Sequence, residues 1–219
     1  MTETCATVTM ETLDANAIGS VGIPLANCNI KIIDPDSGNE LPYNSPGEVC
    51  VSTPGLMKGY YDNQQATNDV IEIVNGEKWL HTGDVGIISD DGLLIITGRI
   101  KRIITRREGN VYHKVFPVLI ESKLAKINGV KEIAIVGRPD DKAGSVPVAY
   151  VVPNYKGNFD ELKKELVSFC FAELDKYEYP VDFICVEEIP RTMLGKVNYL
   201  FLEELAREGH HKENNSGIQ

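Results

Sequence analysis

The stretch Gly98-Arg99-Ile100-Lys101 is where the pattern of apolar residues changes along this chain. Before it, short runs with β-strand character are separated by turn residues, whereas after it helix-like and strand-like segments alternate. Because such a change in period marks a change in architecture, the stretch predicts a domain boundary and an α+β fold in two parts. We expect 1–98 to form a small β-barrel-like subdomain, 99–207 a compact α+β domain with a sheet covered by helices, and 208–219 a frayed tail.

Upstream of this stretch, the candidate strands are short and bounded by turn-forming residues. The run 29–33 ends at an Asp-Pro-Asp-Ser-Gly turn, and the run 47–51 alternates polar and apolar residues. The turn Asp90-Asp91-Gly92 joins two apolar runs, 85–88 and 93–96, and predicts a β-hairpin. These features favour a small barrel or a curled sheet.

Downstream, elements of both kinds are predicted. Apolar residues at helical spacing predict helices over 116–127, 159–174 and 200–207. Apolar runs predict strands at 131–137, 147–152 and 183–187. Helices and strands in this order are typical of a sheet covered by helices.

The composition indicates a soluble globular protein. The 219 residues are 42% hydrophobic and 25% charged, with a formal net charge of −10 and a pI near 4.9. This negative charge repels a phosphate backbone, and the basic cluster at 101–107 is short and lacks aromatic residues, so we expect no nucleic acid partner. No apolar run approaches the roughly 20 residues that cross a bilayer, so we expect no membrane association.

The cysteines and histidines do not have the spacing of a disulfide framework or a metal site. Five scattered cysteines without a Cys-x-x-Cys pair indicate neither disulfides nor a thiolate zinc site, and they fit a reducing, cytoplasmic location. We interpret His81, beside an apolar strand, as a packed or turn histidine rather than a catalytic base. His113 is distant in sequence, and His210 and His211 lie in the polar tail, so no metal site is predicted from the histidines.

Two motifs place charged side chains beside glycine turns. In Trp79-Leu80-His81-Thr82-Gly83-Asp84, the Asp84 carboxylate follows a glycine at the end of a strand. Its two oxygens could there accept hydrogen bonds from a diol, such as that of a ribose. Arg99, which follows Gly98, could direct a guanidinium toward the ribose or a phosphate. Each short motif alone also fits an ordinary surface turn.

The stretch Pro190-Arg191-Thr192-Met193-Leu194-Gly195-Lys196 places a lysine on a turn between a strand-like and a helix-like run. Its glycine lets backbone approach an anion beside the Lys196 ammonium, which can neutralise the charge that builds up as a carboxylate and a phosphate meet. A Walker-type phosphate loop is excluded, because it needs glycine at Pro190 and Ser or Thr at Val197. A solvated turn lysine remains the alternative.

These three motifs, in this order, resemble those of the adenylate-forming (AMP-binding) enzymes, which include acyl-CoA synthetases, luciferases and the adenylation domains of peptide synthetases. In addition, Met1-Thr2-Glu3-Thr4 resembles the Tyr-Gly-x-Thr-Glu motif of the family without its first two residues. The resemblance extends from Met1 to about Leu205. It implies the C-terminal part of such an enzyme, most similar to acyl-CoA synthetases, with the large N-terminal domain missing.

The resemblance also implies roles for the matched residues that lie before the domain boundary. Thr2 would contact the α-phosphate of ATP, and Glu3 would hold Mg²⁺, which prefers carboxylate and phosphate oxygens. Asp84 would bind both ribose hydroxyls, and Arg99 would assist it. Lys101 would be the hinge between the large and the small domain, where a few residues absorb the rotation between two active conformations.

Two further roles are implied for the small domain. Lys196 would be delivered to the active site during adenylate formation and withdrawn afterwards. The loop around Gly109 would then face the thiol nucleophile, most often coenzyme A. The identity of the acid cannot be predicted, because the residues that would shape its pocket are largely outside this sequence.

The implied activity is that of an ATP-dependent carboxylic acid:thiol ligase that acts through an acyl-adenylate and uses ATP, Mg²⁺ and coenzyme A. We expect the 219-residue chain by itself not to adenylate acids, because the glycine-rich phosphate loop, the adenine-stacking segment and most of the acyl pocket are absent. Two alternatives remain: an amino-acid-activating domain that serves a carrier protein, and a truncated, non-catalytic nucleotide-binding module.

Overall fold

The computed structural model describes residues 1–17, 19–154 and 158–216. Contacts within the chain divide it into two compact units, Met1–Lys101 (the N-terminal unit) and Arg102–Gln219 (the C-terminal unit). The division therefore falls at the stretch where the apolar pattern changes. In the described ranges, no helix is both long enough and apolar enough to cross a bilayer.

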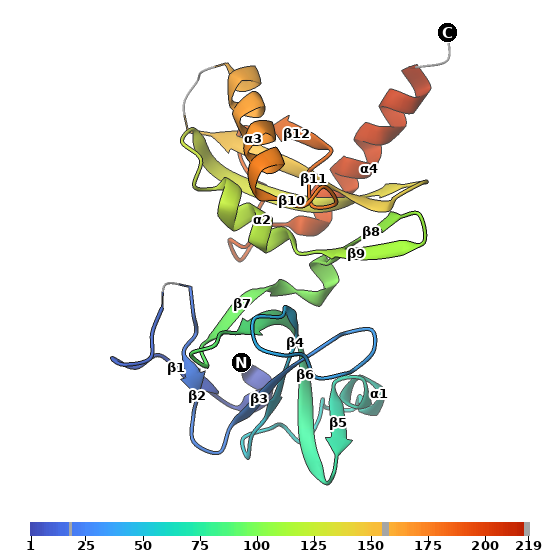
Figure 1. Ribbon diagram of the computed structural model, residues 1–219. Coiled ribbons are helices and arrows are strands. Elements are labelled where there is room, and N and C mark those ends of the chain that lie inside the picture. Colours follow the sequence, from blue (N-terminus) through green and yellow to red (C-terminus); the bar gives the residue numbers. More distant parts are fainter. Residues whose placement is uncertain (18, 155–157, 217–219) are drawn as a thin grey trace. The chain divides into compact units, whose positions relative to one another are not determined.

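Strands dominate the N-terminal unit (Figure 1). In chain order its elements are η1 (Thr2–Thr4), β1 (Thr9–Met10), β2 (Ile23–Pro24), β3 (Asn29–Ile33), β4 (Gly47–Ser52), α1 (Gln64–Asn68), β5 (Ile71–Val74), β6 (Glu77–Ile88), β7 (Leu94–Arg99) and η2 (Ile100–Arg102), the last of which crosses into the C-terminal unit. β1 and β2 form a separate two-stranded sheet, and β3 to β7 form a five-stranded one.

The long strand β6 gives the five-stranded sheet its curl. β4 pairs along one edge of β6, while β5 and then β7 pair along the other. β6 thus pairs with β5 along its first part and with β7 along its second part, and the sheet bends along the length of β6. Ile88 pairs with Leu94 across the Asp90-Asp91-Gly92 turn, which confirms the predicted hairpin. The curled sheet and the α+β class predicted from the sequence are also confirmed.

Every residue of β4 is buried, although the strand has one apolar and one polar face. Val49 and Val51 pack in the core cluster of this unit with Ile32 and Leu94. Because side chains alternate along a strand, the opposite face carries its polar residues, Glu48, Cys50 and Ser52. The buried polar groups on this second face need partners, and they supply much of the site described below.

The C-terminal unit is a five-stranded sheet with helices. Its elements are β8 (Ile104–Glu108), β9 (Val111–Val115), α2 (Pro117–Leu124), β10 (Val130–Asp140), β11 (Gly144–Pro153), α3 (Phe159–Glu173), β12 (Asp182–Cys185) and α4 (Tyr199–Ser216). The strand order is β10-β11-β8-β9, and β12 pairs parallel to β11. β11 is therefore the central strand.

Both faces of this sheet are covered (Figure 1). On one face, α2 and α3 bury residues such as Leu124 and Leu166, both 0% exposed, against β10 and β11. On the other face, α4 buries Leu202, and the Tyr150 hydroxyl donates a hydrogen bond of 3.2 Å to the Leu202 carbonyl. Since each buried leucine stabilises the fold by roughly 1.5–3 kcal/mol, the two apolar layers hold the unit together.

Two details differ from the sequence-based prediction. The region after Lys101 forms a β-hairpin, β8–β9, which was not among the predicted elements. α4 continues to Ser216, beyond the predicted end at Arg207, whereas 217–219 of the predicted tail lie outside the described residues. The apolar pattern predicted the part of α4 that packs on the sheet, where Leu202 and Ala206 are buried.

Candidate functional site

A bulge in β6 presents Asp84. Between β4 and β6, Cys50 pairs with His81 and Glu48 pairs with Val85. The two paired positions are two residues apart on β4 but four residues apart on β6. The two extra residues make the bulge, and Gly83 in it has φ +67° with open space around its Cα, so the backbone dihedral is what favours glycine there. Asp84 therefore lies inside a strand, whereas the sequence predicted it at a strand end.

Side chains replace the ladder hydrogen bonds that the bulge removes. The Gly83 N–H donates to Glu48 Oε1 at 3.1 Å, and the Thr82 hydroxyl donates to the Val49 carbonyl at 2.7 Å. The same hydroxyl oxygen accepts from the Asp84 N–H at 3.0 Å. Because its polar groups are paired, the bulge is a defined conformation rather than a loose loop.

Arg99 lies opposite Asp84 on the neighbouring strand β7. Its Nε is 2.9 Å from Asp84 Oδ1, and its Nη1 donates to the Thr82 carbonyl at 3.3 Å. Burial raises the pKa of Asp84, and the Arg99 charge opposes this rise. The structure thus brings together the two residues that the sequence assigned to ribose binding, as a half-buried carboxylate held by an exposed guanidinium.

The start of the chain lies near this carboxylate. Thr2 begins the 3-10 helix η1, and the Glu3 carbonyl accepts a 2.7 Å hydrogen bond from the Met57 N–H. The Tyr60 hydroxyl donates to Glu3 Oε1 at 3.3 Å. The charge of Glu3 is among the causes that raise the pKa of Asp84, so the two carboxylates interact electrostatically. Two neighbouring carboxylates favour a bound cation or a shared proton.

In the C-terminal unit, Lys196 lies on a tightly bonded turn. The Thr192 N–H donates to the Lys196 carbonyl at 2.7 Å, and the Gly195 N–H donates to the Thr192 carbonyl at 2.8 Å. Arg191 donates to the Gly195 carbonyl at 3.1 Å and pairs with Glu132 at 2.9 Å. Within the part of the chain that the structure describes, no carboxylate pairs with the exposed Lys196 ammonium, so the turn is ordered while its charge is available.

Gly109 lies in a two-residue β-turn, and Lys101 lies in a short 3-10 helix. Gly109 is the first residue of the two-residue turn between β8 and β9, where Glu108 pairs with Val111 and glycine adopts φ +60°. Lys101 is exposed, lies in η2 and is the last residue of the N-terminal unit. Gly109 and Lys196 thus lie on separate turns of the C-terminal unit, whereas Thr2, Glu3, Asp84 and Arg99 all belong to the N-terminal one.

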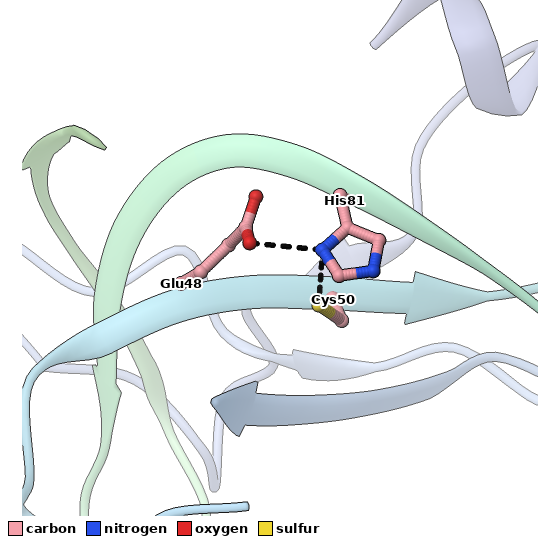
Figure 2. Close-up of side chains that lie close together, drawn as sticks. All are labelled: Glu48, Cys50 and His81. Carbon is pink, nitrogen blue, oxygen red and sulfur yellow. Dashed lines mark hydrogen bonds and ion pairs between the residues drawn. The ribbon is translucent and has the colours of Figure 1, made fainter. Parts of the chain in front are cut away.

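Beside the bulge, β4 and β6 form a polar cluster that the sequence did not predict. His81 Nδ1 lies 2.9 Å from Glu48 Oε2 and 3.7 Å from Cys50 Sγ, as Figure 2 shows, and His81 Nε2 lies 3.5 Å from Glu72 Oε2. The hydrogen bonds to Cys50 and Glu48 raise the pKa of His81 to about 10, against the effect of burial. His81 is a packed histidine, as expected, but it is grouped with donors from other strands, which spacing along the sequence cannot reveal.

Comparison with known proteins places these observations in a family. The family model of the AMP-binding enzyme matches residues 1–61, and that of the AMP-binding enzyme C-terminal domain matches residues 119–196. The chain belongs to the AMP-binding enzymes. Among curated relatives, the putative acyl-CoA ligase YdaB of Bacillus subtilis is 41% identical over 179 residues, which are 81% of this chain and 33% of that protein.

Other AMP-binding enzymes match more of the chain. The 2-succinylbenzoate–CoA ligase of Bacillus cereus is 35% identical over 210 residues, which are 95% of this chain and 41% of that enzyme. The ATP-bound structure of MatB from Rhodopseudomonas palustris has a TM-score of 0.81 at 30% identity, covering 94% of this chain and 39% of MatB. The chain spans 33% and 41% of the length of the two curated relatives named here.

A further structural relative carries a reaction intermediate. It is the o-succinylbenzoate CoA synthetase of Bacillus subtilis in complex with the acyl-adenylate intermediate OSB-AMP, with a TM-score of 0.75 and 30% identity, covering 93% of this chain and 40% of that one. This AMP-binding enzyme and MatB match both units of the present chain, and their fold agrees with the two-part α+β architecture.

Proposed function

We propose that this chain contributes part of the nucleotide-binding site and the catalytic lysine of an ATP-dependent carboxylic acid:coenzyme A ligase. This ligase acts through an acyl-adenylate. The observation that carries the proposal is the Asp84–Arg99 pair on a braced bulge, in a chain that also presents Lys196 on an ordered turn. Support comes from relatives named as CoA ligases and from the relative whose structure holds an acyl-adenylate.

In the first half-reaction, a carboxylate oxygen of the acid attacks the α-phosphorus of ATP, and the bond to the pyrophosphate oxygen breaks. The Asp84 carboxylate accepts hydrogen bonds from the ribose hydroxyls, with Arg99 fixing its orientation. Thr2 contacts the α-phosphate. The Lys196 ammonium offsets the negative charge that grows as the two anions meet, and this is the step at which such a charge contributes most.

Glu3 fits a ligand for Mg²⁺, because it is an oxygen donor close enough to Asp84 for the two carboxylates to interact. When bound, Mg²⁺ would neutralise phosphate charge. Tyr60 holds one oxygen of Glu3 in place at 3.3 Å.

In the second half-reaction, a thiolate attacks the carbonyl carbon of the acyl-adenylate and AMP leaves. We assign the thiol side to the turn at Gly109, and the change between steps to rotation at Lys101. The thiol is coenzyme A, since the relatives are named as CoA ligases. Lys196 then serves only the adenylation step.

A hybrid enzyme tests this proposal. In the hybrid ligase, this chain replaces the region that it matches in the Bacillus cereus 2-succinylbenzoate–CoA ligase. We expect the hybrid ligase to release pyrophosphate from ATP and to form the CoA thioester with 2-succinylbenzoate, whereas the 219-residue chain alone does neither. A folded hybrid ligase that binds ATP but forms no acyl-adenylate would contradict the proposal, as would pyrophosphate release by the chain alone.

The ribose contact gives a sharper prediction. In the hybrid ligase, Asp84→Asn keeps the shape of the side chain but removes its charge, and a hydrogen bond to a charged group contributes about 1.5–3 kcal/mol. We therefore expect the KM for ATP to rise about 10- to 100-fold. Asp91→Asn, at an exposed turn of the same unit, is the matched control and should leave this KM unchanged. Equal KM values for both variants would remove Asp84 from the nucleotide site.

The raised pKa of Asp84 sets a pH dependence for the same contact. Only the ionised carboxylate accepts both ribose hydrogen bonds, and burial raises the pKa of this carboxyl. ATP affinity should therefore be full above the raised pKa and be lost as the pH falls through it, at a higher pH than for an ordinary aspartate. The KM for ATP of the hybrid ligase, measured from neutral to mildly acidic pH, checks this. In Asp84→Asn this acid limb should disappear.

A further inference from the structure

The polar face of β4 brings together three side chains of different metal-binding types. Glu48 and Cys50 are two residues apart on β4 and so point to the same side, and His81 is the cross-strand partner of Cys50 on β6. In Figure 2 all three converge, with the imidazole above the thiol and beside the carboxylate. One ligand atom from each lies within 4.8 Å of the other two.

The spacing of these atoms is close to that of a metal coordination shell. Tetrahedral Zn²⁺ with bonds of about 2.0–2.3 Å keeps its ligand atoms roughly 3.3–3.7 Å apart. Here Nδ1 of His81 is 2.9 Å from Glu48 Oε2 and 3.7 Å from Cys50 Sγ. The Nδ1–Sγ distance falls within this range, whereas the Nδ1–Oε2 distance is shorter, so the carboxylate would move outward on metal binding.

Outer contacts already orient two of the three side chains. Glu72 lies 3.5 Å from His81 Nε2, on the side of the ring away from the cluster, as the carboxylate does in carboxylate–histidine–metal arrangements. The second oxygen of Glu48 accepts the Gly83 N–H at 3.1 Å, which leaves Oε2 for the cluster. The nearby cation Lys31, the cross-strand partner of Cys50, is directed to the ring of Trp79 at 4.3 Å.

The burial of the thiol excludes it from surface chemistry. Cys50 is 0% exposed and Glu48 7%, whereas the His81 side chain is 26% exposed and so provides the open side of the cluster. The proposed ligase reaction uses none of these three side chains. A thiolate, an imidazole and a carboxylate together select borderline-soft divalent ions and disfavour Mg²⁺ or Ca²⁺.

We propose that Glu48, Cys50 and His81 form a binding site for a divalent transition metal such as Zn²⁺, separate from the Mg²⁺ expected at Glu3. The three side chains provide one oxygen, one sulfur and one nitrogen ligand, and a fourth position stays open, as in three-ligand zinc sites. Binding would release the thiol proton of Cys50 and the Nδ1 proton of His81, because both ligand atoms must be deprotonated to bind the metal. Because Glu48 also holds the Gly83 N–H, the metal would brace the bulge that presents Asp84.

Cobalt(II) is the probe for this site in the full 219-residue chain, since a cobalt–thiolate bond gives a charge-transfer absorption band. We expect the metal-free protein to develop this band with one equivalent of Co²⁺, and Zn²⁺ to displace it. Cys50→Ser should abolish the band. Glu72→Gln changes a half-exposed outer residue without disturbing the core, and it should weaken Co²⁺ binding about 10-fold or more.

Two controls separate this site from adventitious binding. Cys28→Ser removes another cysteine of the same unit and should keep the band. A variant with His210→Ala and His211→Ala removes the adjacent histidine pair and should also keep it. No band in the unaltered chain, a band that survives Cys50→Ser, unchanged affinity in Glu72→Gln, or loss of the band in either control variant would each overturn the proposal.

Discussion

Lys196→Ala in the hybrid ligase should slow acyl-adenylate formation about 10²- to 10³-fold, the usual cost of removing one preorganised group that stabilises charge in a transition state. We expect the slower rate to come from the missing ammonium and not from a change in the fold. The turn that carries Lys196 is closed by its own backbone hydrogen bonds and by Arg191, so the substitution removes an ammonium and leaves the backbone in place.

The two half-reactions should respond differently. Pyrophosphate exchange measures adenylation, and thioester formation from pre-formed acyl-adenylate measures the second step. We expect the second rate to stay within a few-fold, because Lys196 is withdrawn at that stage. Lys164→Ala removes an exposed lysine from α3 and should leave both rates unchanged. An equal loss in both half-reactions would show that Lys196 maintains the fold or the substrate site instead.

Arg102→Ala should destabilise the C-terminal unit by about 3 kcal/mol, the scale for removing one partner of a buried ion pair. Arg102 Nη2 lies 2.6 Å from Glu121 Oε1, and both side chains are mostly buried, at 15% and 13% exposure. The guanidinium carbon lies 3.5 Å from the centroid of the Tyr199 ring. The substitution would leave the Glu121 carboxylate buried without this cation, while the Ile135 N–H still donates to it at 2.7 Å.

Urea unfolding can follow the two units separately. Helical circular dichroism reports mainly the C-terminal unit, which contains α2, α3 and α4, whereas the fluorescence of Trp79, the single tryptophan, reports the N-terminal unit. Arg102→Ala should shift the first signal and not the second. Arg107→Ala, an exposed arginine on β8, should shift neither. Equal shifts of the circular dichroism transition in Arg102→Ala and Arg107→Ala would mean that the buried Arg102–Glu121 pair does not stabilise the C-terminal unit.

The pH gives an independent check on the Arg102→Ala prediction. Burial raises the pKa of Glu121, and the charge of Arg102 opposes that rise. Without Arg102 the folded pKa lies further above the unfolded one, so the folded state takes up a proton more readily. The destabilisation should therefore be smaller below the raised pKa of Glu121 and grow as the pH rises through it.

The apolar pattern predicted the packed elements well. The strand at 29–33 has the predicted bounds, and the α3 region and the β6–β7 hairpin lie where the sequence indicated them. Each of these elements buries one face, so its apolar residues recur along the sequence at the spacing of a helix or a strand. The β8–β9 hairpin was missed because charged residues, among them Arg106 and Arg107, occupy much of its first strand and hide the alternation.

The geometry around Asp84 depends on contacts that sequence spacing does not contain. The motif identified the carboxylate and the glycine, but the bulge arises from pairing between strands more than 30 residues apart in sequence. The grouping of Glu48, Cys50 and His81 has the same origin. Cys-x-x-Cys or His-x-x-His spacing would have signalled a metal site, whereas donors spread over two strands of a sheet give no such pattern.

The bulge in β6 also supplies a spectroscopic reporter. The amide protons of Gly83 and Asp84 donate to side-chain oxygens of Glu48 and Thr82. Their hydrogen–deuterium exchange rates therefore measure how firmly those two side chains stay in position, even with no ligand bound. A variant that accelerates exchange at these two amides alone has loosened the support of Asp84 and left the sheet intact.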